Sequence, residues 1–329
     1  MTPDDSRALA ATLLGRPVLA ARPVARGGNN RIFAIETESG RLALKSYPPQ
    51  AEDRRDRLGQ EWRALSFLTR HGLPVPAPVV VAPERHAALY RWIEGRPAAE
   101  TDLDAIADMG AFFARLQGLR ADDGAAALPA GSTPVFTADQ ALAQFEDRLA
   151  PLAGVAAVAD HLTAVRRAAA RAFERARDLL GSGFATSPDP ARRVLSPSDF
   201  GRHNMLATET GAIFLDFEYF GWDGPEKAIA DAILHPGSAF TAPDRDRLRT
   251  LMLAALPDDR TLPARLDAML PLFGLIWCLI LLNEFRPDRM ARRGLAEGAA
   301  ETQAARARQL EKSHALLSWL EDAYDLAPA

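Results

Sequence analysis

Three polar residues in one stretch of the chain have the types and the spacing that transfer of a charged group requires. Asp199 is followed five residues later by Asn204, and Asp216 comes directly after the apolar residues 212–215. A carboxylate can accept the proton of an attacking hydroxyl, and a second carboxylate with an amide oxygen can hold Mg²⁺ against phosphates. Transfer of a phosphoryl group from ATP needs little more than this, because positioning and charge neutralisation supply most of the catalysis. The segment therefore indicates a site of phosphoryl transfer.

Asp199 also opens the triplet Asp-Phe-Gly, which is the metal-binding triplet of protein kinases. If Asp199 were that metal ligand, a catalytic aspartate with an asparagine five residues after it would lie upstream. Neither Asp178 nor Asp189 has an asparagine at that distance. The literal match is therefore rejected, and Asp199 is predicted to be the base, with Asn204 and Asp216 as the metal ligands.

The phosphates of ATP also need cationic and backbone partners, and the first third of the chain offers candidates. Lys45 ends the apolar run 42–45 and is predicted to contact the α- and β-phosphates. Glu61 lies on the helix predicted to follow and is expected to hold Lys45. A turn that could cover the phosphates, although it lacks the GxGxxG pattern, contains Gly27, Gly28, Asn29 and Asn30. An ordinary turn explains these four residues equally well.

The elements expected around these residues fall into two groups. Residues 22–34 and 41–47 flank a glycine-containing turn and predict a β-hairpin, whereas the 3.6-residue period of residues 53–70 predicts a helix. Two more strands are expected at 79–81 and 87–93, and helices at 105–119, 138–149, 156–180 and from about 225 onward. This order predicts an α+β fold with a small β-rich N-terminal lobe (1–93), a larger α-helical C-terminal lobe (94–329) and the active site between them.

Composition and charge exclude several classes of protein. The net charge of −4 and the interspersed arginines argue against a general nucleic-acid-binding protein, and the single cysteine, Cys278, excludes an internal disulfide. Residues 268–282 are apolar, but this run is shorter than the roughly 20 residues that span a bilayer and contains Pro271, so a buried helix is predicted. The first ten residues lack the pattern of a secretory signal. We therefore expect a cytoplasmic protein with no membrane partner. The sequence leaves the oligomeric state open.

In this order, the pieces resemble the aminoglycoside phosphotransferase and choline kinase family, which shares the protein-kinase fold. The resemblance covers roughly residues 22–235 and also includes residues 221–231, which follow the predicted metal aspartate. It implies that residues 89–95 form the hinge between the lobes, so that Tyr90 and Trp92 lie beside the nucleotide. It also implies ATP and Mg²⁺ as cofactors and a small-molecule hydroxyl as acceptor, on an aminoglycoside, an amino alcohol or a sugar metabolite.

One position departs from the family pattern. The family usually has a histidine two residues before the catalytic aspartate, and Pro197 stands there in this chain. Ser196 and Ser198 are predicted to brace the loop instead. The departure leaves an alternative open, namely a pseudokinase that binds a nucleotide or a partner without transferring phosphate.

The region after the predicted base is unusually acidic. Residues 198–240 contain seven acids and two bases, which gives this segment a charge of −5. Asp223, Glu226 and Asp231 have no necessary role in holding metal. Two explanations stay open for them: they attract a cationic acceptor, or they form a solvated acidic face.

Overall fold

The computed structural model describes residues 1–24, 30–49, 53, 55–101, 103–186, 189–286 and 299–327. The chain divides into two compact units. Unit 1 contains Met1–Thr133 and Leu195–Trp222, and unit 2 contains Pro134–Val194 and Asp223–Ala329. The lobe boundary at residue 93 is a different division of the chain and stays a prediction.

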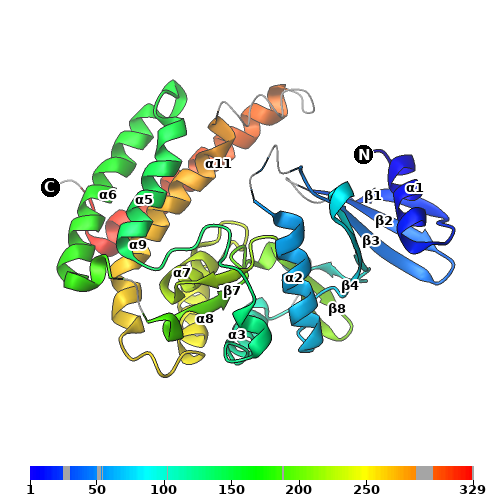
Figure 1. Ribbon diagram of the computed structural model, residues 1–329. Coiled ribbons are helices and arrows are strands. Elements are labelled where there is room, and N and C mark those ends of the chain that lie inside the picture. Colours follow the sequence, from blue (N-terminus) through cyan, green and yellow to red (C-terminus); the bar gives the residue numbers. More distant parts are fainter. Residues whose placement is uncertain are drawn as a thin grey trace. The chain divides into compact units, whose positions relative to one another are not determined.

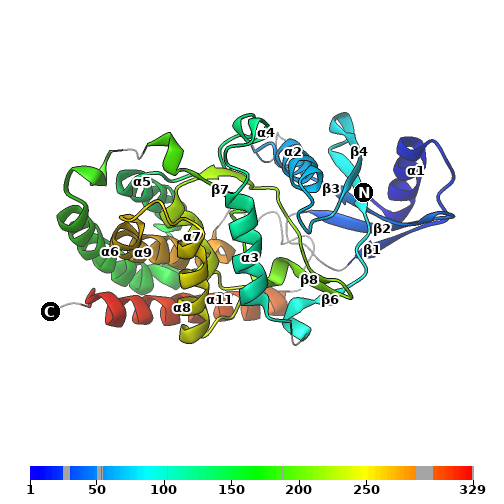
Figure 2. The ribbon, with the colours of Figure 1, turned by 90° about the horizontal axis from the view of Figure 1, so that it is seen from below.

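A five-stranded antiparallel sheet forms the first half of unit 1. Its strand order is β1-β2-β3-β5-β4, and helices α1 and α2 cover opposite faces of the sheet (Figures 1 and 2). The elements are α1 (Pro3–Leu14), β1 (Ala20–Val24), β2 (Arg31–Thr37), β3 (Gly40–Ser46), α2 (Arg57–Arg70), β4 (Pro78–Ala82) and β5 (Ala87–Arg91). The predicted hairpin, helix and two further strands are confirmed, whereas α1 and the separation of β1 from β2 were not predicted.

Side-chain alternation along β3 explains why its lysine faces α2. Leu42 and Leu44 belong to the buried cluster on the α1 side of the sheet. Successive side chains of a strand point to opposite faces, so Lys45 points to the α2 side. Helix α2 is capped by Asp56, whose side chain accepts a hydrogen bond from the backbone of the first turn, and it buries Glu61 on the face toward the sheet. The two residues that the sequence analysis paired therefore meet.

The second half of unit 1 contains the predicted site residues Asp199, Asn204 and Asp216 on and beside a short sheet. A three-stranded sheet has the order β6-β8-β9, with the bounds β6 (Arg96–Pro97), β8 (Met205–Thr208) and β9 (Gly211–Phe214). Unit 1 also contains the helices α3 (Ala105–Gln117) and α4 (Asp123–Ala126), which follow β6 in the sequence. Strands β7 (Val194–Ser196) and β10 (Gly221–Asp223) pair with each other, and the division between the units falls inside both strands.

An aromatic cluster anchors this part of unit 1. The ring of Phe112 on α3 lies 5.7 Å from Phe200, 4.3 Å from Phe214 and 6.0 Å from Phe217, measured between ring centroids. Phe200 and Phe217 each follow directly after one of the two predicted site aspartates in the sequence. Burial of these rings therefore fixes the backbone at both aspartates.

Unit 2 is helical in the part that the structure describes. Helix α9 packs against α5, α6, α7 and α11, and α8 packs against α7. The bounds are α5 (Ala138–Leu149), α6 (Ala159–Leu180), α7 (Pro225–Leu234), α8 (Ala242–Ala254), α9 (Leu262–Leu281) and α11 (Ala299–Tyr324) (Figure 1). Gly274 permits close approach of α11, because a Cβ atom there would lie 2.7 Å from the side chain of Leu320.

Helix α9 and the turn after it include the apolar run noted in the sequence. Leu262–Phe285 is long and apolar enough to cross a membrane by length and composition, but 78% of its most apolar window is buried inside the protein. The buried helix predicted for residues 268–282 is confirmed. Among the described residues, no other helix passes the same test of length and composition.

Candidate active site

A β-hairpin brings the two predicted metal ligands side by side. Strands β8 and β9 are antiparallel, with Met205 opposite Phe214, and the backbone N–H of Leu215 donates to the carbonyl oxygen of Asn204 at 2.8 Å. Asn204 therefore precedes one strand at the point where Asp216 follows the other. This pairing register explains how an asparagine and an aspartate twelve positions apart in the sequence reach one site.

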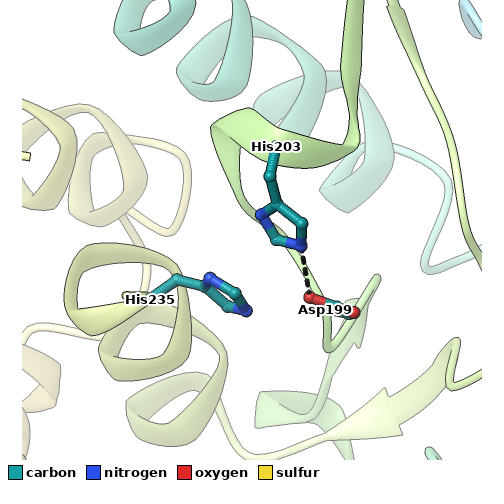
Figure 3. Close-up of side chains that lie close together, drawn as sticks. All are labelled: Asp199, His203 and His235. Carbon is teal, nitrogen blue, oxygen red and sulfur yellow. Dashed lines mark ion pairs between the residues drawn. The ribbon is translucent and has the colours of Figure 1, made fainter. Parts of the chain in front are cut away.

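The loop before β8 holds the predicted base next to Asn204. The side-chain amide of Asn204 donates from Nδ2 to the carbonyl oxygen of Asp199 at 3.0 Å. His203, in the short 3₁₀ turn Arg202–Asn204, places Nε2 3.2 Å from Oδ1 of the Asp199 carboxylate (Figure 3). The Asp199 side chain is one-quarter exposed, so its carboxylate stays accessible.

Two serines stabilise the loop where the family histidine is missing. The backbone N–H of Ser198 donates to Oγ of buried Ser196 at 3.0 Å, and Oγ of Ser198 donates to the carbonyl oxygen of Tyr219 at 3.1 Å. Ser198 has a φ of 64°, a left-handed conformation that such hydrogen bonds help to hold. The predicted bracing of the loop around Pro197 is confirmed.

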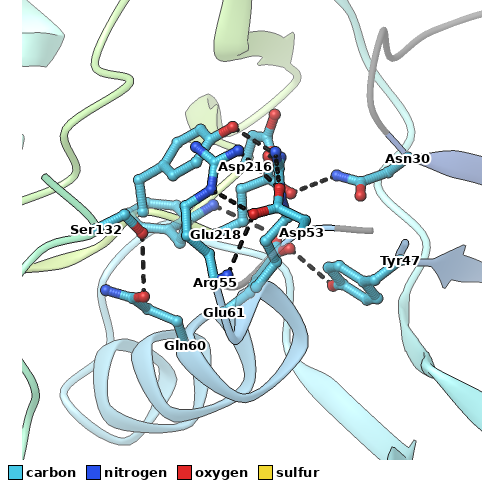
Figure 4. A network of polar contacts seen from close by, with 12 residues as sticks. Asn30, Tyr47, Asp53, Arg55, Gln60, Glu61, Ser132, Asp216 and Glu218 are labelled. Atoms are coloured by element: carbon cyan, nitrogen blue, oxygen red, sulfur yellow. Dashed lines mark hydrogen bonds and ion pairs between the residues drawn. The ribbon is translucent and has the colours of Figure 1, made fainter. Parts of the chain in front are cut away.

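Lys45 lies between two carboxylates. Its Nζ is 2.7 Å from Oε2 of Glu61 and 2.6 Å from Oδ1 of Asp216, two residues of the network in Figure 4. Burial by itself lowers the pKa of Lys45, but the negative charges of Asp216 and Glu61 outweigh burial and hold this pKa well above its usual value. Lys45 therefore keeps its positive charge beside the predicted metal ligand.

Asp216 is the accessible member of a group of three acids. Carboxylate oxygens of Glu61, Asp216 and Glu218 lie within 4.8 Å of one another, and the Asp216 side chain is 32% exposed whereas the other two are nearly covered. Asp216 also has a φ of 67°, which costs a non-glycine residue roughly 1–2 kcal/mol. Asp216 and Asn204 offer the hard oxygen donors that Mg²⁺ prefers, so the residues present fit this ion.

Glu218 belongs to a buried ion-pair network that the sequence analysis did not find. It pairs with the guanidinium of Arg57 and accepts a hydrogen bond from Nδ2 of Asn30 at 2.5 Å (Figure 4). Arg57 also donates to Asp53 at 2.6 Å and to the hydroxyl of Tyr219 at 2.7 Å. The network connects the end of the predicted phosphate-covering turn to the start of α2 and to the segment after Asp216. No local signal in the sequence pairs Arg57 with an acid 161 positions away.

The other residues predicted to contact the nucleotide differ in what the structure shows of them. Gly27, Gly28 and Asn29 lie outside the described residues. Tyr90 is buried, with its hydroxyl 2.8 Å from that of Tyr47. Trp92 carries the guanidinium of Arg41 5.3 Å from its ring centroid, and its buried Nε1 has no hydrogen-bond partner among the described residues. Nucleotide contact by these residues stays a prediction.

The acids of residues 223–231 are buried and paired in unit 2. Asp223 and Asp231 lie 2.9 Å and 2.7 Å from Nζ of Lys227, and Glu226 lies 2.5 Å from Nε of Arg265. Asp223, Glu226 and Asp231 are 0%, 3% and 9% exposed. The explanation as a solvated acidic face is therefore wrong, because these carboxylates are covered and neutralised within unit 2.

Comparisons with known proteins agree with this geometry. A model of the phosphotransferase enzyme family matches residues 20–269, and no curated protein matches the sequence. Solved structures with a similar fold include a spectinomycin phosphotransferase in complex with ADP and spectinomycin (TM-score 0.64, 12% identity, 96% of this chain and 98% of that one). They also include a choline/ethanolamine kinase family protein from Mesorhizobium loti (TM-score 0.63, 19% identity, 95% and 94%). A third is a choline kinase from Streptococcus pneumoniae (TM-score 0.63, 14% identity, 96% and 98%).

These likenesses confirm the predicted α+β, protein-kinase-like fold, and the family match confirms the predicted enzyme class. The match covers both sheets of unit 1, the loop of Asp199 and Asn204 and the chain as far as the first eight residues of α9, and therefore most of the chain. The chain belongs to the phosphotransferase enzyme family.

Proposed function

We propose that the protein transfers the γ-phosphate of ATP to a hydroxyl group of a small molecule. The observation that carries this proposal is the position of Lys45, whose Nζ lies within 2.7 Å of both Glu61 and Asp216. The residue before Asp216, Leu215, donates its backbone N–H to Asn204, which in turn donates to Asp199. A positive charge next to an accessible carboxylate suits a site for a metal-bound polyphosphate. Complexes of similar folds with ADP and with AMP support a nucleotide substrate.

The proposed roles follow from the chemistry of each side chain. The Asp199 carboxylate accepts the proton of the acceptor hydroxyl. The oxygen of that hydroxyl forms a bond to the γ-phosphorus, and the bond from this phosphorus to the β–γ bridging oxygen breaks, so that ADP leaves. Lys45 neutralises charge on the α- and β-phosphates, and Glu61 orients Lys45. When bound, Mg²⁺ supplies charge neutralisation at the phosphate oxygens, and Asp216 with Asn204 would hold it.

Two further residues, Asn30 and Trp92, are proposed to lie beside the bound nucleotide. Asn30 ends the turn that would cover the phosphates, and its hydrogen bond to Glu218 ties the turn to the segment of Asp216. Trp92 follows β5 directly, and its buried Nε1 is a hydrogen-bond donor that a bound purine or its water could satisfy. These two positions support the hinge and the turn that the family resemblance implies.

The proposed acceptor is a small molecule with a hydroxyl group, and several classes of such molecules are candidates. Similar solved structures include enzymes that act on spectinomycin and on choline, so an aminoglycoside, an amino alcohol and a sugar metabolite are all candidates. Asp223, Glu226 and Asp231 do not favour a cationic acceptor over a neutral one, because each is paired with a cation in unit 2.

The test has a binding step and a transfer step. MgATP at about 100 times its dissociation constant should stabilise the protein by roughly 2.7 kcal/mol, and Asp216→Ala should remove this stabilisation. Release of ADP is then measured with a panel of aminoglycosides, amino alcohols and sugars, and without acceptor, since water can replace the alcohol. Binding without hydrolysis or transfer would favour the pseudokinase, and equal MgATP affinity in Asp216→Ala would remove Asp216 from the metal site.

A further inference from the structure

The carboxylate of Glu61 is held by more than the lysine that the proposed function assigns to it. Its Oε2 accepts from Nζ of Lys45 and from the hydroxyl of Tyr47, both at 2.7 Å, and its Oε1 accepts from the backbone N–H of Phe217 at 3.4 Å. The Tyr47 hydroxyl lies 2.8 Å from that of Tyr90. All of the side chains in this chain of hydrogen bonds are buried.

The direction of these hydrogen bonds follows from counting protons. A carboxylate only accepts, so the single proton of the Tyr47 hydroxyl goes to Glu61. The bond between the two tyrosines must then use the proton of Tyr90, with the Tyr47 oxygen accepting. Tyr90 therefore orients Tyr47, and Tyr47 orients Glu61. Burial, together with the negative charge of Glu61, raises the pKa of Tyr47 well above its usual value, which keeps this proton in place.

Strand geometry puts Tyr47 in contact with both members of the ion pair. Lys45 and Tyr47 are two positions apart and therefore point to the same face of the sheet, and Tyr90 on β5 pairs with Ala43, which also points to that face. The ammonium of Lys45 lies 5.3 Å from the centroid of the Tyr47 ring. Tyr47 thus contacts Lys45 with its ring and Glu61 with its hydroxyl.

Two carboxylates compete for Lys45, because Asp216 is as close to its ammonium as Glu61 is. When Lys45 moves toward the phosphates of a nucleotide, Glu61 loses part of the charge that compensates its burial. A buried carboxylate without donors is costly, so a second donor on the same oxygen maintains its position. Tyr47 supplies that donor.

We propose that Tyr47, oriented by Tyr90, is a positioning residue that fixes Glu61 so that Lys45 is presented to the phosphates of ATP. The proposal rests on the proposed function, since it assigns Lys45 to the nucleotide. It also gives Tyr90 a role through Tyr47 rather than through direct contact with the nucleotide.

Three variants test it: Tyr47→Phe, Tyr90→Phe and the double variant, with Tyr324→Phe in unit 2 as the matched control. Loss of a hydrogen bond to a charged group predicts a MgATP dissociation constant about tenfold higher in Tyr47→Phe. In Tyr90→Phe we expect about threefold, and the double variant should match Tyr47→Phe alone, because Tyr90 acts only through Tyr47. The control should bind like the wild type, and melting temperatures measured in parallel show that each variant is folded.

The readout separates this proposal from the proposed function. If the wild type itself binds no MgATP, the proposed function fails. If the wild type binds and Tyr47→Phe binds within twofold of it, the positioning role fails. If the fold-increases of the two single variants multiply in the double variant, Tyr90 acts independently of Tyr47, and the route through Tyr47 is wrong. A binding loss in Tyr47→Phe with unchanged stability, by contrast, distinguishes positioning from a purely structural role.

Discussion

Each of the two units contains a buried lysine between two carboxylates, and the two clusters differ in what surrounds them. In unit 1, Lys45 contacts Glu61 and Asp216, and we call these three residues the open cluster. In unit 2, Lys227 contacts Asp223 and Asp231, and we call these three the closed cluster. Both have one cation and two anions, at distances between 2.6 and 2.9 Å.

The closed cluster is satisfied within unit 2. Asp223 accepts from the backbone N–H groups of Val135 and Gly224 at 2.8 Å, and Asp231 accepts from Nε1 of Trp277 at 3.0 Å. The charges of Asp223 and Asp231 outweigh the burial of Lys227 and raise its pKa. Every carboxylate thus has a neutral donor in addition to the lysine, and little surface remains for a ligand.

The open cluster draws its members from three separate elements and leaves one of them accessible. Asp216 is the most exposed acid of the two clusters and holds a left-handed backbone conformation. The left-handed conformation costs free energy, and a purely structural ion pair does not need it, whereas the exposure leaves the carboxylate free to bind a ligand. One lysine and two acids therefore do not define a function; the hydrogen bonds around them and the surface left free do.

The largest effect is expected at the base beside the open cluster. Asp199→Asn removes the proton acceptor while keeping its size, so kcat should fall by about 10² to 10⁴ with nearly unchanged MgATP affinity. The measurement is turnover with the best acceptor of the panel. The matched control is Glu209→Gln, which changes an exposed acid in the turn between β8 and β9 and should retain full activity. Turnover of Asp199→Asn within about threefold of the wild type would exclude this role.

The second prediction exchanges the two lysines for methionine. Lys227→Met leaves two buried acids without their cation and should lower the free energy of unfolding by about 3–5 kcal/mol. Lys45→Met should cost less stability, because solvent reaches Asp216, but should weaken MgATP binding. Urea unfolding and nucleotide titration of both variants check this. A larger stability loss in Lys45→Met than in Lys227→Met would reverse the assignment of the two clusters.

Much of the site around Asp199 could be predicted from sequence because the spacing of its residues is local. The five-residue step from Asp199 to Asn204 and the apolar residues before Asp216 predicted a loop followed by a strand, and the hairpin of β8 and β9 brings these residues together. The pairing of Arg57 with Glu218 could not be predicted, because it joins segments that meet only after folding. Local patterns thus find the residues of a site but not the partners that hold them.

Other features were missed although the sequence contains a signal. Asp223, Lys227 and Asp231 are spaced by four residues, which on a helix predicts the observed ion pairs. Helix α1 begins with a capping box between Thr2 and Asp5, a recognisable pattern for a helix start. A count of net charge alone predicts free acids in this segment, whereas the four-residue spacing predicts that Asp223 and Asp231 pair with Lys227.

The third prediction removes one charge from the closed cluster. Asp223→Asn keeps an oxygen for Val135 and Gly224 but turns an amide toward Lys227, so stability should fall by about 1–3 kcal/mol. The Michaelis constant of the acceptor, measured at 0.1 M and 1 M salt, should show the same salt dependence as in the wild type, since a paired and buried acid exerts little field outside the protein. An acceptor constant that rises in Asp223→Asn and loses its salt dependence would restore the cationic-acceptor role.

The smallest effect concerns a buried histidine of unit 2 and the pH dependence of stability. Ser313 donates from Oγ to the carbonyl oxygen of Cys278, so it accepts from Nε2–H of His161, and the opposite ring nitrogen, Nδ1, is buried with no partner among the described residues. Burial, followed by the nearby His314, lowers the pKa of His161 from 6.5 to about 4.

The sign follows from proton counting: between pH 6.5 and pH 4 the unfolded chain binds a proton at His161 that the native state excludes, so stability falls as the pH falls through this window. Between pH 7 and pH 5 the loss should be on the order of 1 kcal/mol. His161→Gln keeps an N–H donor for Ser313 but cannot titrate, so its urea-unfolding free energy should depend less steeply on pH. Measured at pH 5, 6 and 7, parallel lines for variant and wild type would contradict the prediction, since they would mean that His161 takes up its proton equally in the native and unfolded states.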